Sequence, residues 1–98
     1  MAILIADSGS TKTDWRIIDA QEKIHQAKTA GLNPYHQSSE QMAEVLDQEL
    51  LPQLTVPVEQ VFFYGAGCAN PTVNQTAVQA LRNTFPDAQV QVESDLLA

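Results

Sequence analysis

A run of small polar residues with one lysine offers the first recognisable chemistry in this sequence. It reads Asp7-Ser8-Gly9-Ser10-Thr11-Lys12-Thr13 and follows the apolar segment 2–6. Glycine permits backbone angles that expose consecutive amides, and hydroxyls and an ammonium group add further donors to phosphate oxygens. Asp7 ends the apolar segment, where its carboxylate is placed to hold a hydrated Mg²⁺. The run therefore predicts a phosphate site formed by Gly9, Ser10, Thr11, Lys12 and Thr13, with Asp7 as a metal ligand through water.

A Walker P-loop and a plain hairpin turn are the two alternatives to this phosphate site. A Walker P-loop needs glycine directly before its lysine and a helix after the loop. Thr11 occupies the glycine position, and the residues after Thr13 alternate as a strand does, so the P-loop interpretation fails on both counts. A plain hairpin turn stays open, because Ser, Gly and Thr are common in turns.

Charge and composition limit the classes of partner. The 98 residues include 12 acidic and 5 basic side chains, for a net charge of −7. This charge disfavours nucleic acid and anionic membranes, so an anionic ligand must be held by local donors. Cys68 is the single cysteine, which excludes an internal disulfide. The first residues lack a basic segment and a long apolar run, so we expect a soluble, cytoplasmic protein.

Three segments near the start of the chain have the patterns of strands. They span residues 2–6, 13–19 and 23–29. The first is apolar throughout, which is typical of a strand buried on both faces. The second places Trp15 and Ile17 on one face, where we expect core rather than a sugar-stacking surface. The third has a weak pattern, which indicates an edge strand.

Helical spacing appears in the second half of the chain. Ser38 and Gln41 form a predicted capping box at the start of a helix, and Pro52 lies just beyond its predicted end. The remaining predicted elements are a strand at 58–64, a helix from Asn70 and Pro71 to Pro86, a strand at 88–93, and a helix that begins at Ser94-Asp95 and is cut off.

The predicted order of elements is therefore β-β-β-α-β-α-β. Short turns make the first three strands antiparallel, whereas helical connections make the later strands parallel. A mixed sheet covered by helices, within the α/β class, satisfies both constraints.

Three further segments hold candidate site residues. Gly31-Leu32-Asn33-Pro34 predicts a turn before a helix. Gly65-Ala66-Gly67 follows a strand, but it lacks the third glycine of a dinucleotide-binding fingerprint. Ser94-Asp95 follows the last strand, where Asp is a favoured helix N-cap. Cys68 is expected to fill space rather than act as a nucleophile. His25 and His36 have no metal-spaced partner and are expected at the surface.

The segment 7–14 resembles the first phosphate motif of actin-like ATPases. It is most similar to the Asp-Gly-Gly-Gly-Thr-Lys-Thr form of the N-acetylglucosamine kinase-like group, which includes the BadF/BadG/BcrA/BcrD ATPases. Ser8 and Ser10 replace glycines of that motif. The resemblance covers nearly all of residues 1–98. It implies a ribonuclease H-like, actin-like ATPase sheet, here as an N-terminal subdomain that is incomplete at its C-terminal end and lacks the second nucleotide-binding lobe.

The resemblance also implies roles for individual residues. Asn33 matches the asparagine of a Gly-x-x-Asn segment that binds sugar hydroxyls, and Gly65 and Gly67 would line the sugar side of the cleft. Asp95 matches the general base that takes the proton of the sugar hydroxyl. The role of Asp14 stays open.

The function implied is a kinase that uses ATP and Mg²⁺ to phosphorylate a hexose or amino sugar, with N-acetylglucosamine as the first expectation. The chain of 98 residues alone is expected to be inactive. Three alternatives remain: a non-catalytic sugar or nucleotide sensor, a BadF-type ATPase that activates a dehydratase, and an inactive fragment. A homodimer is also left open.

Overall fold

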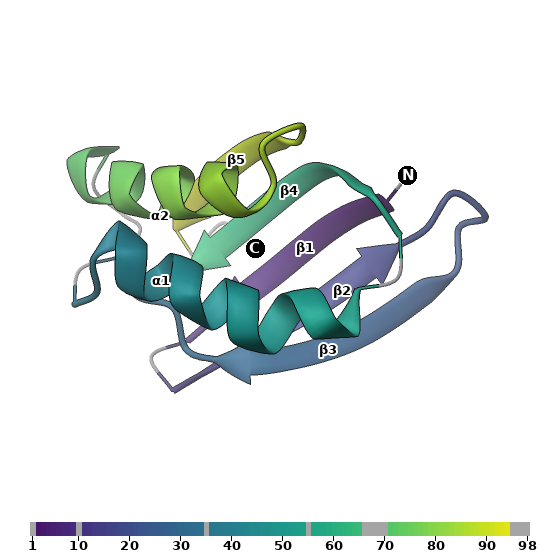
Figure 1. The fold of residues 1–98 in the computed structure, drawn as a ribbon, viewed down its shortest axis with the longest axis horizontal. Helices are drawn as coiled ribbons and strands as arrows, with labels where there is room; N and C mark the ends of the chain where they lie inside the picture. Colours follow the sequence, from purple (N-terminus) through teal and green to yellow (C-terminus); the bar gives the residue numbers. More distant parts are fainter. Residues whose placement is uncertain (1, 10, 35, 55, 66–70, 95–98) are drawn as a thin grey trace.

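Five strands form one sheet, and the helices pack on one of its faces (Figure 1). The computed structural model describes the chain except for residues 1, 10, 35, 55, 66–70 and 95–98. The strands are β1 (Ala2–Ser8), β2 (Lys12–Ile18), β3 (Ile24–Ala30), β4 (Val58–Gly65) and β5 (Gln89–Ser94). The helical segments are α1 (Ser39–Val45), η1 (Leu46–Leu50), η2 (Leu51–Gln53) and α2 (Pro71–Thr84). The predicted order of elements is thereby confirmed.

The sheet is mixed, with strand order β3-β2-β1-β4-β5. β1 pairs antiparallel with β2, and β2 pairs antiparallel with β3. β1 and β5 both pair parallel with β4. β3 lies at the edge, as its weak pattern predicted. The helical connections on either side of β4 make the later pairings parallel, as the lengths of the connections required.

Side chains on the helix-covered face of the sheet form the core. Leu4 and Phe63 are 0% exposed, and Trp15 is 1% exposed. The Trp15 indole N–H donates to Thr29 Oγ1 at 3.1 Å, and its ring centroid lies 6.1 Å from that of Phe63. The hydrogen bond to Thr29 thus satisfies the indole N–H of Trp15, while the indole rings fill the space under the helices. The prediction of Trp15 as a core residue is confirmed.

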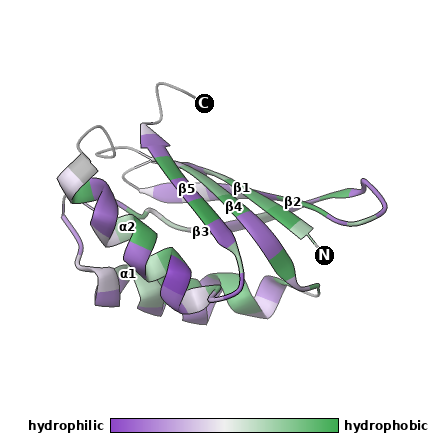
Figure 2. Cartoon of the chain, turned by 90° about the horizontal axis from the view of Figure 1, so that it is seen from above, coloured by the Kyte–Doolittle hydropathy of each residue, from purple (hydrophilic) through white to green (hydrophobic). Residues whose placement is uncertain are grey.

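The opposite face of the sheet carries none of the described helices (Figure 2). The prediction that the first strand is buried on both faces is therefore wrong. Burial alternates along β1: Leu4 and Ala6 are buried, whereas Ile3 and Ile5 on the other face are only partly buried. The uniformly apolar composition of β1 does not indicate that helices cover only one of its faces. We call this surface the open face of the sheet.

The capping box at the start of α1 is present as predicted. Ser38 Oγ accepts a hydrogen bond from the Gln41 amide at 3.2 Å, and Gln41 Oε1 accepts one from the Ser38 amide at 2.9 Å. After α1 the chain continues as the π-helical segment η1 and the 3₁₀ segment η2. Pro52 therefore lies within a helical turn, not beyond it, because an early position of a short helix requires no proline N–H. None of the described helices is both long and apolar enough to cross a bilayer.

Asp19 organises the turn between β2 and β3. Its Oδ1 accepts hydrogen bonds from the amides of Gln21 and Lys23 at 2.9 and 3.0 Å, and Glu22 takes a left-handed φ of 64°. His25 Nε2 lies 3.1 Å from Asp19 Oδ2. The hydrogen bond to His25, together with that from the Lys23 amide, lowers the pKa of Asp19 below its ordinary value of 3.8. The prediction of His25 as a surface residue is confirmed, since its side chain is 57% exposed.

Replacement of Leu46 by alanine tests the account of the core. Leu46 is 0% exposed, so Leu46→Ala should lower the free energy of unfolding by about 2–5 kcal/mol through lost burial and a residual cavity. Asp47→Ala, at the exposed neighbouring position, should change it by less than about 0.5 kcal/mol. Urea denaturation followed by circular dichroism measures both variants. Equal effects of the two substitutions would contradict the packing described.

Candidate functional site

One edge of the sheet collects the ends of the strands that carry the predicted site residues. Ser8 lies opposite Gly65 on one side and opposite Thr13 on the other. Gly65 in turn lies opposite Ser94. β1, β4 and β5 therefore end in one row, next to the start of β2. In α/β proteins, ligands bind outside the carboxyl ends of parallel strands.

The hairpin between β1 and β2 presents part of the predicted phosphate site to solvent. Thr11 and Lys12 are exposed, and Asp7 is exposed just before the turn. The described part of the hairpin is neither helical nor buried as a whole, and its lysine and Thr11 are exposed. A cation and a hydroxyl donor in this position are suited to an anion such as phosphate.

Gly9 contributes differently from the sequence expectation. Its φ lies outside the left-handed region, and a Cβ added there would meet the Lys12 carbonyl oxygen at an ordinary 3.6 Å. The Gly9 amide donates to the same carbonyl at 2.9 Å. The expectation that glycine-only angles expose this amide is therefore wrong, because the hydrogen bond that closes the hairpin uses it.

The hydroxyl of Thr13 does not face the predicted ligand. Thr13 is 0% exposed, and its Oγ1 donates to the Ala30 carbonyl oxygen at 3.1 Å and lies 2.8 Å from Ser8 Oγ. The alternation of β2 turns Thr13 toward the helix-covered face while Lys12 turns away from it. The expectation that the Thr13 hydroxyl binds phosphate is therefore corrected: this hydroxyl supports the hairpin from within.

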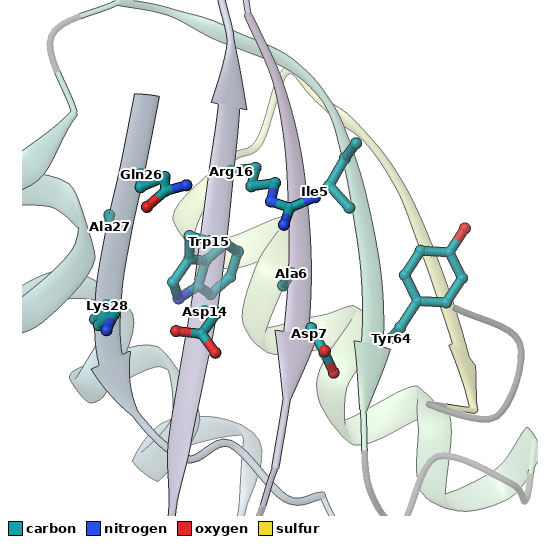
Figure 3. Close-up of a pocket in the computed structure, with 10 residues that line it drawn as sticks. All are labelled: Ile5, Ala6, Asp7, Asp14, Trp15, Arg16, Gln26, Ala27, Lys28 and Tyr64. Atoms are coloured by element: carbon teal, nitrogen blue, oxygen red, sulfur yellow. The ribbon is translucent and has the colours of Figure 1, made fainter. Parts of the chain in front are cut away.

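A hollow of about 600 Å³ lies on the open face, next to the predicted metal ligand (Figure 3). Asp7 and Asp14 are direct cross-strand partners on β1 and β2, and their side chains project from this face. Lys28 lies opposite Asp14 on β3, and Tyr64 lies opposite Asp7 on β4. The row therefore has two adjacent acidic side chains at its centre, with a cation on one side and a phenol on the other.

The donor set near Asp7 fits a hydrated Mg²⁺ in type. Mg²⁺ in nucleotide sites is held by one or two carboxylates, phosphate oxygens and water. Asp7 and Asp14 offer carboxylates on adjacent strands. No cluster of three or more His, Cys, Asp or Glu side chains able to hold a metal occurs among the described residues.

Asn33 lies in a tightly hydrogen-bonded turn after β3. Its amide donates to Gln37 Oε1 at 2.7 Å, and its carbonyl oxygen accepts from the amides of His36 and Gln37 at 3.0 and 2.9 Å. Gly65 ends β4 within the row described above. The predicted site residues Ser10, Gly67 and Asp95, and also Cys68, lie outside the described residues.

Sequence reasoning missed the residue that joins two of these segments. The Leu32 amide donates to Ser8 Oγ at 3.0 Å, although the two residues are 24 positions apart. In the sequence, Ser8 differs from the related motif only in replacing a glycine. That replacement was the available signal, since a hydroxyl pointing into the core needs a buried partner.

Comparison with solved structures finds a similar protein from Porphyromonas gingivalis, described as a "putative N-acetylglucosamine kinase". The two chains share 36% sequence identity with a TM-score of 0.85 over 95% of this chain. This chain spans 34% of the length of that protein. No protein-family model and no curated protein matches the chain. The likeness confirms the resemblance to the N-acetylglucosamine kinase-like group that residues 7–14 indicated.

Loss of the hydroxyl should destabilise the protein at one threonine of the hairpin and have little effect at the other. Thr13→Val removes the donor to the Ala30 carbonyl oxygen and the contact with Ser8 Oγ from a fully buried position, so it should lower the free energy of unfolding by about 0.5–1.5 kcal/mol. Thr11→Val removes an exposed hydroxyl and should change stability by less than about 0.5 kcal/mol. The midpoints of urea denaturation compare the stability of the two variants with that of the wild type. A Thr13→Val protein as stable as the wild type would contradict the buried network.

Proposed function

We propose that this chain is the part of an ATP- and Mg²⁺-dependent sugar kinase that holds the terminal phosphates and the sugar. The observation that carries the proposal is the exposed Lys12 hairpin at the carboxyl edge of a mixed sheet, next to the strand that leads to Asn33. The 36% identity to a protein described as a kinase supports it. On this proposal the sheet belongs to the ribonuclease H-like, actin-like ATPase class, and the rest of the nucleotide site lies in a longer protein.

Lys12 is proposed to offset the charge of the phosphates. The chain carries a net charge of −7, so its overall field repels a nucleotide. A lysine on an exposed hairpin acts at short range, where a direct hydrogen bond outweighs a diffuse and screened repulsion. Ser10 and Thr11 add hydroxyl donors in the same turn. Asp7 is proposed to hold Mg²⁺ through water, and Mg²⁺ when bound spreads the negative charge of the transferred group.

Asn33 is proposed to bind sugar hydroxyls. An amide side chain both donates and accepts, as recognition of a hydroxyl requires. The hydrogen bonds that fix the Asn33 backbone reduce the entropy lost when a sugar binds. Gly65 and Gly67 would leave room for the sugar, because neither adds a side chain at the strand end.

Asp95 is proposed as the general base. It follows Ser94, which lies in the same row as Ser8 and Gly65. Its carboxylate would accept the proton of a sugar hydroxyl while that oxygen forms a bond to the γ-phosphorus. The bond from the γ-phosphorus to the β–γ bridging oxygen breaks, and ADP leaves with the electron pair. N-acetylglucosamine is the first substrate to test, with other hexoses and amino sugars as the comparison set.

The two alternatives to a kinase differ from it in the products that they form. A sensor on the same fold would bind ligand without forming sugar phosphate, whereas a dehydratase activator would hydrolyse ATP without a sugar. Cytoplasmic location and a homodimer remain expectations of the proposal. Sugar phosphate measured alongside ADP therefore separates the kinase from both.

Replacement of Asp95 tests the base. In the complete protein, Asp95→Asn should lower kcat by about 10²–10⁴-fold, because the amide cannot accept the proton, while the Kd for ATP stays within about twofold. Asp87→Asn, at an exposed position between α2 and β5, is the matched control and should retain wild-type kcat. A coupled ADP assay and calorimetry give both quantities. Wild-type turnover by Asp95→Asn would remove the base assignment.

Replacement of Lys12 tests the phosphate contact. Lys12→Met keeps the length of the side chain but removes its charge, so the Kd for Mg·ATP should rise about tenfold or more. Lys23→Met removes an exposed lysine from the turn at the opposite edge of the sheet and should leave the Kd within about twofold. Unchanged affinity in Lys12→Met would refute the role given to the hairpin.

A further inference from the structure

A buried hydroxyl joins the phosphate hairpin to the turn that carries Asn33. Ser8 ends β1 and is 0% exposed. Its Oγ accepts a hydrogen bond from the Leu32 amide at 3.0 Å and lies 2.9 Å from the Leu32 carbonyl oxygen, to which it can donate. Both backbone polar groups of Leu32 therefore meet one side-chain oxygen. A contact of this kind fixes the distance and the orientation of the two segments together.

Thr13 extends this connection to the end of β3. Its Oγ1 lies 2.8 Å from Ser8 Oγ and donates to the Ala30 carbonyl oxygen at 3.1 Å. Each hydroxyl carries one proton and can accept from others. Both residues are 0% exposed, so water cannot replace a lost partner. A shift of the hairpin relative to residues 30–32 would leave a buried polar group unpaired, which is unfavourable.

The position of Leu32 determines that of Asn33. The Leu32 side chain is 0% exposed and belongs to the core. The Asn33 backbone is held on its other side by Gln37, through the contacts at 2.7 and 2.9 Å. The Asn33 backbone thus follows a core residue on one side and is hydrogen-bonded to Gln37 on the other. On the hairpin side, Lys12 directly precedes Thr13. The residue proposed to bind phosphate, Lys12, and the residue proposed to bind sugar, Asn33, are therefore each adjacent in sequence to a member of the Ser8–Thr13–Leu32 network.

We infer that Ser8 is a positioning residue that couples sugar binding at Asn33 to phosphate binding at Lys12. The inference rests on the proposed function and adds a role for a residue that touches neither ligand. Binding of a phosphate orders the hairpin, and through Ser8 it orders the turn that meets the sugar. The second ligand then binds to a segment that is already fixed, which gives positive coupling. The related motif has glycine at this position, and glycine has no side chain that could make this contact.

The connection itself is tested without ligand. Ser8→Ala removes only the hydroxyl, and Ser8→Gly installs the residue of the related motif. Amide hydrogen exchange followed by NMR should be about tenfold faster or more at Leu32 in both variants, because its amide loses its acceptor. The Leu81 amide in α2 should change much less. Thr84→Val, which removes a hydroxyl that donates to Ala80 at 3.0 Å, is the matched control and should leave Leu32 unchanged.

The coupling is tested with both ligands in the complete protein. Calorimetry gives the Kd for N-acetylglucosamine with and without a saturating non-hydrolysable analogue of Mg·ATP. The wild type and Thr84→Val should bind the sugar about fivefold more tightly or better when the nucleotide is present. In Ser8→Ala this ratio should fall toward one, while the nucleotide alone still binds within about threefold of the wild type. A structural role without positioning would weaken binding of both ligands and leave the ratio intact.

The outcomes separate the inference from the function on which it rests. Wild-type exchange at Leu32 in both Ser8 variants would overturn the connection. Faster exchange with an undiminished binding ratio would overturn the coupling alone. A wild-type protein that binds neither ligand would overturn the proposed function, and the coupling with it. If Ser8→Ala does not fold, Ser8→Gly provides the same two measurements.

Discussion

Strand direction is the constraint on which the site depends. β1 runs parallel to β4, and β4 runs parallel to β5, so all three strands end at the same edge of the sheet. The antiparallel β2 begins at that edge, and β3 ends there. Segments far apart in the sequence thereby become neighbours, as Ser8 and Leu32 show across 24 positions. They are the Lys12 hairpin, the Asn33 turn and the end of β4. A different register would separate them, because a slip of one residue turns every side chain to the other face.

The chain carries a net charge of −7, so its overall field repels anions, and the proposed phosphate site depends on local donors at one hairpin. The exposed Lys12 and Thr11 lie above a support of buried hydroxyls, Ser8 and Thr13, whose hydrogen bonds are all internal. A side chain above a rigid support loses less entropy on binding than one on a mobile loop. The buried hydroxyls thus contribute to the site through rigidity rather than through contact.

The sequence predicted the order of elements because local signals were strong and agreed with one another. The Ser38–Gln41 capping box, the alternation of Trp15 and Ile17, and the weak edge pattern of β3 each correspond to a feature of the structure. Burial of β1 was predicted wrongly, since an apolar composition cannot tell one covered face from two. The prediction that the Thr13 hydroxyl faces the ligand was also wrong. It treated every hydroxyl of the motif as a donor and ignored the alternation of side chains along β2. The Ser8–Leu32 contact lay beyond sequence reasoning, as it depends on the approach of two distant segments.

The central claim is that the hairpin between β1 and β2 holds the terminal phosphates of a nucleotide. An NMR titration of the complete protein with Mg·ATP measures this directly, residue by residue. The account predicts that the amide chemical shifts of Thr11 and Lys12 change most. Those of Leu32 and Asn33 should change less, and those in the turn at Asp19 should change little. Saturable binding that leaves Thr11 and Lys12 unshifted would contradict it.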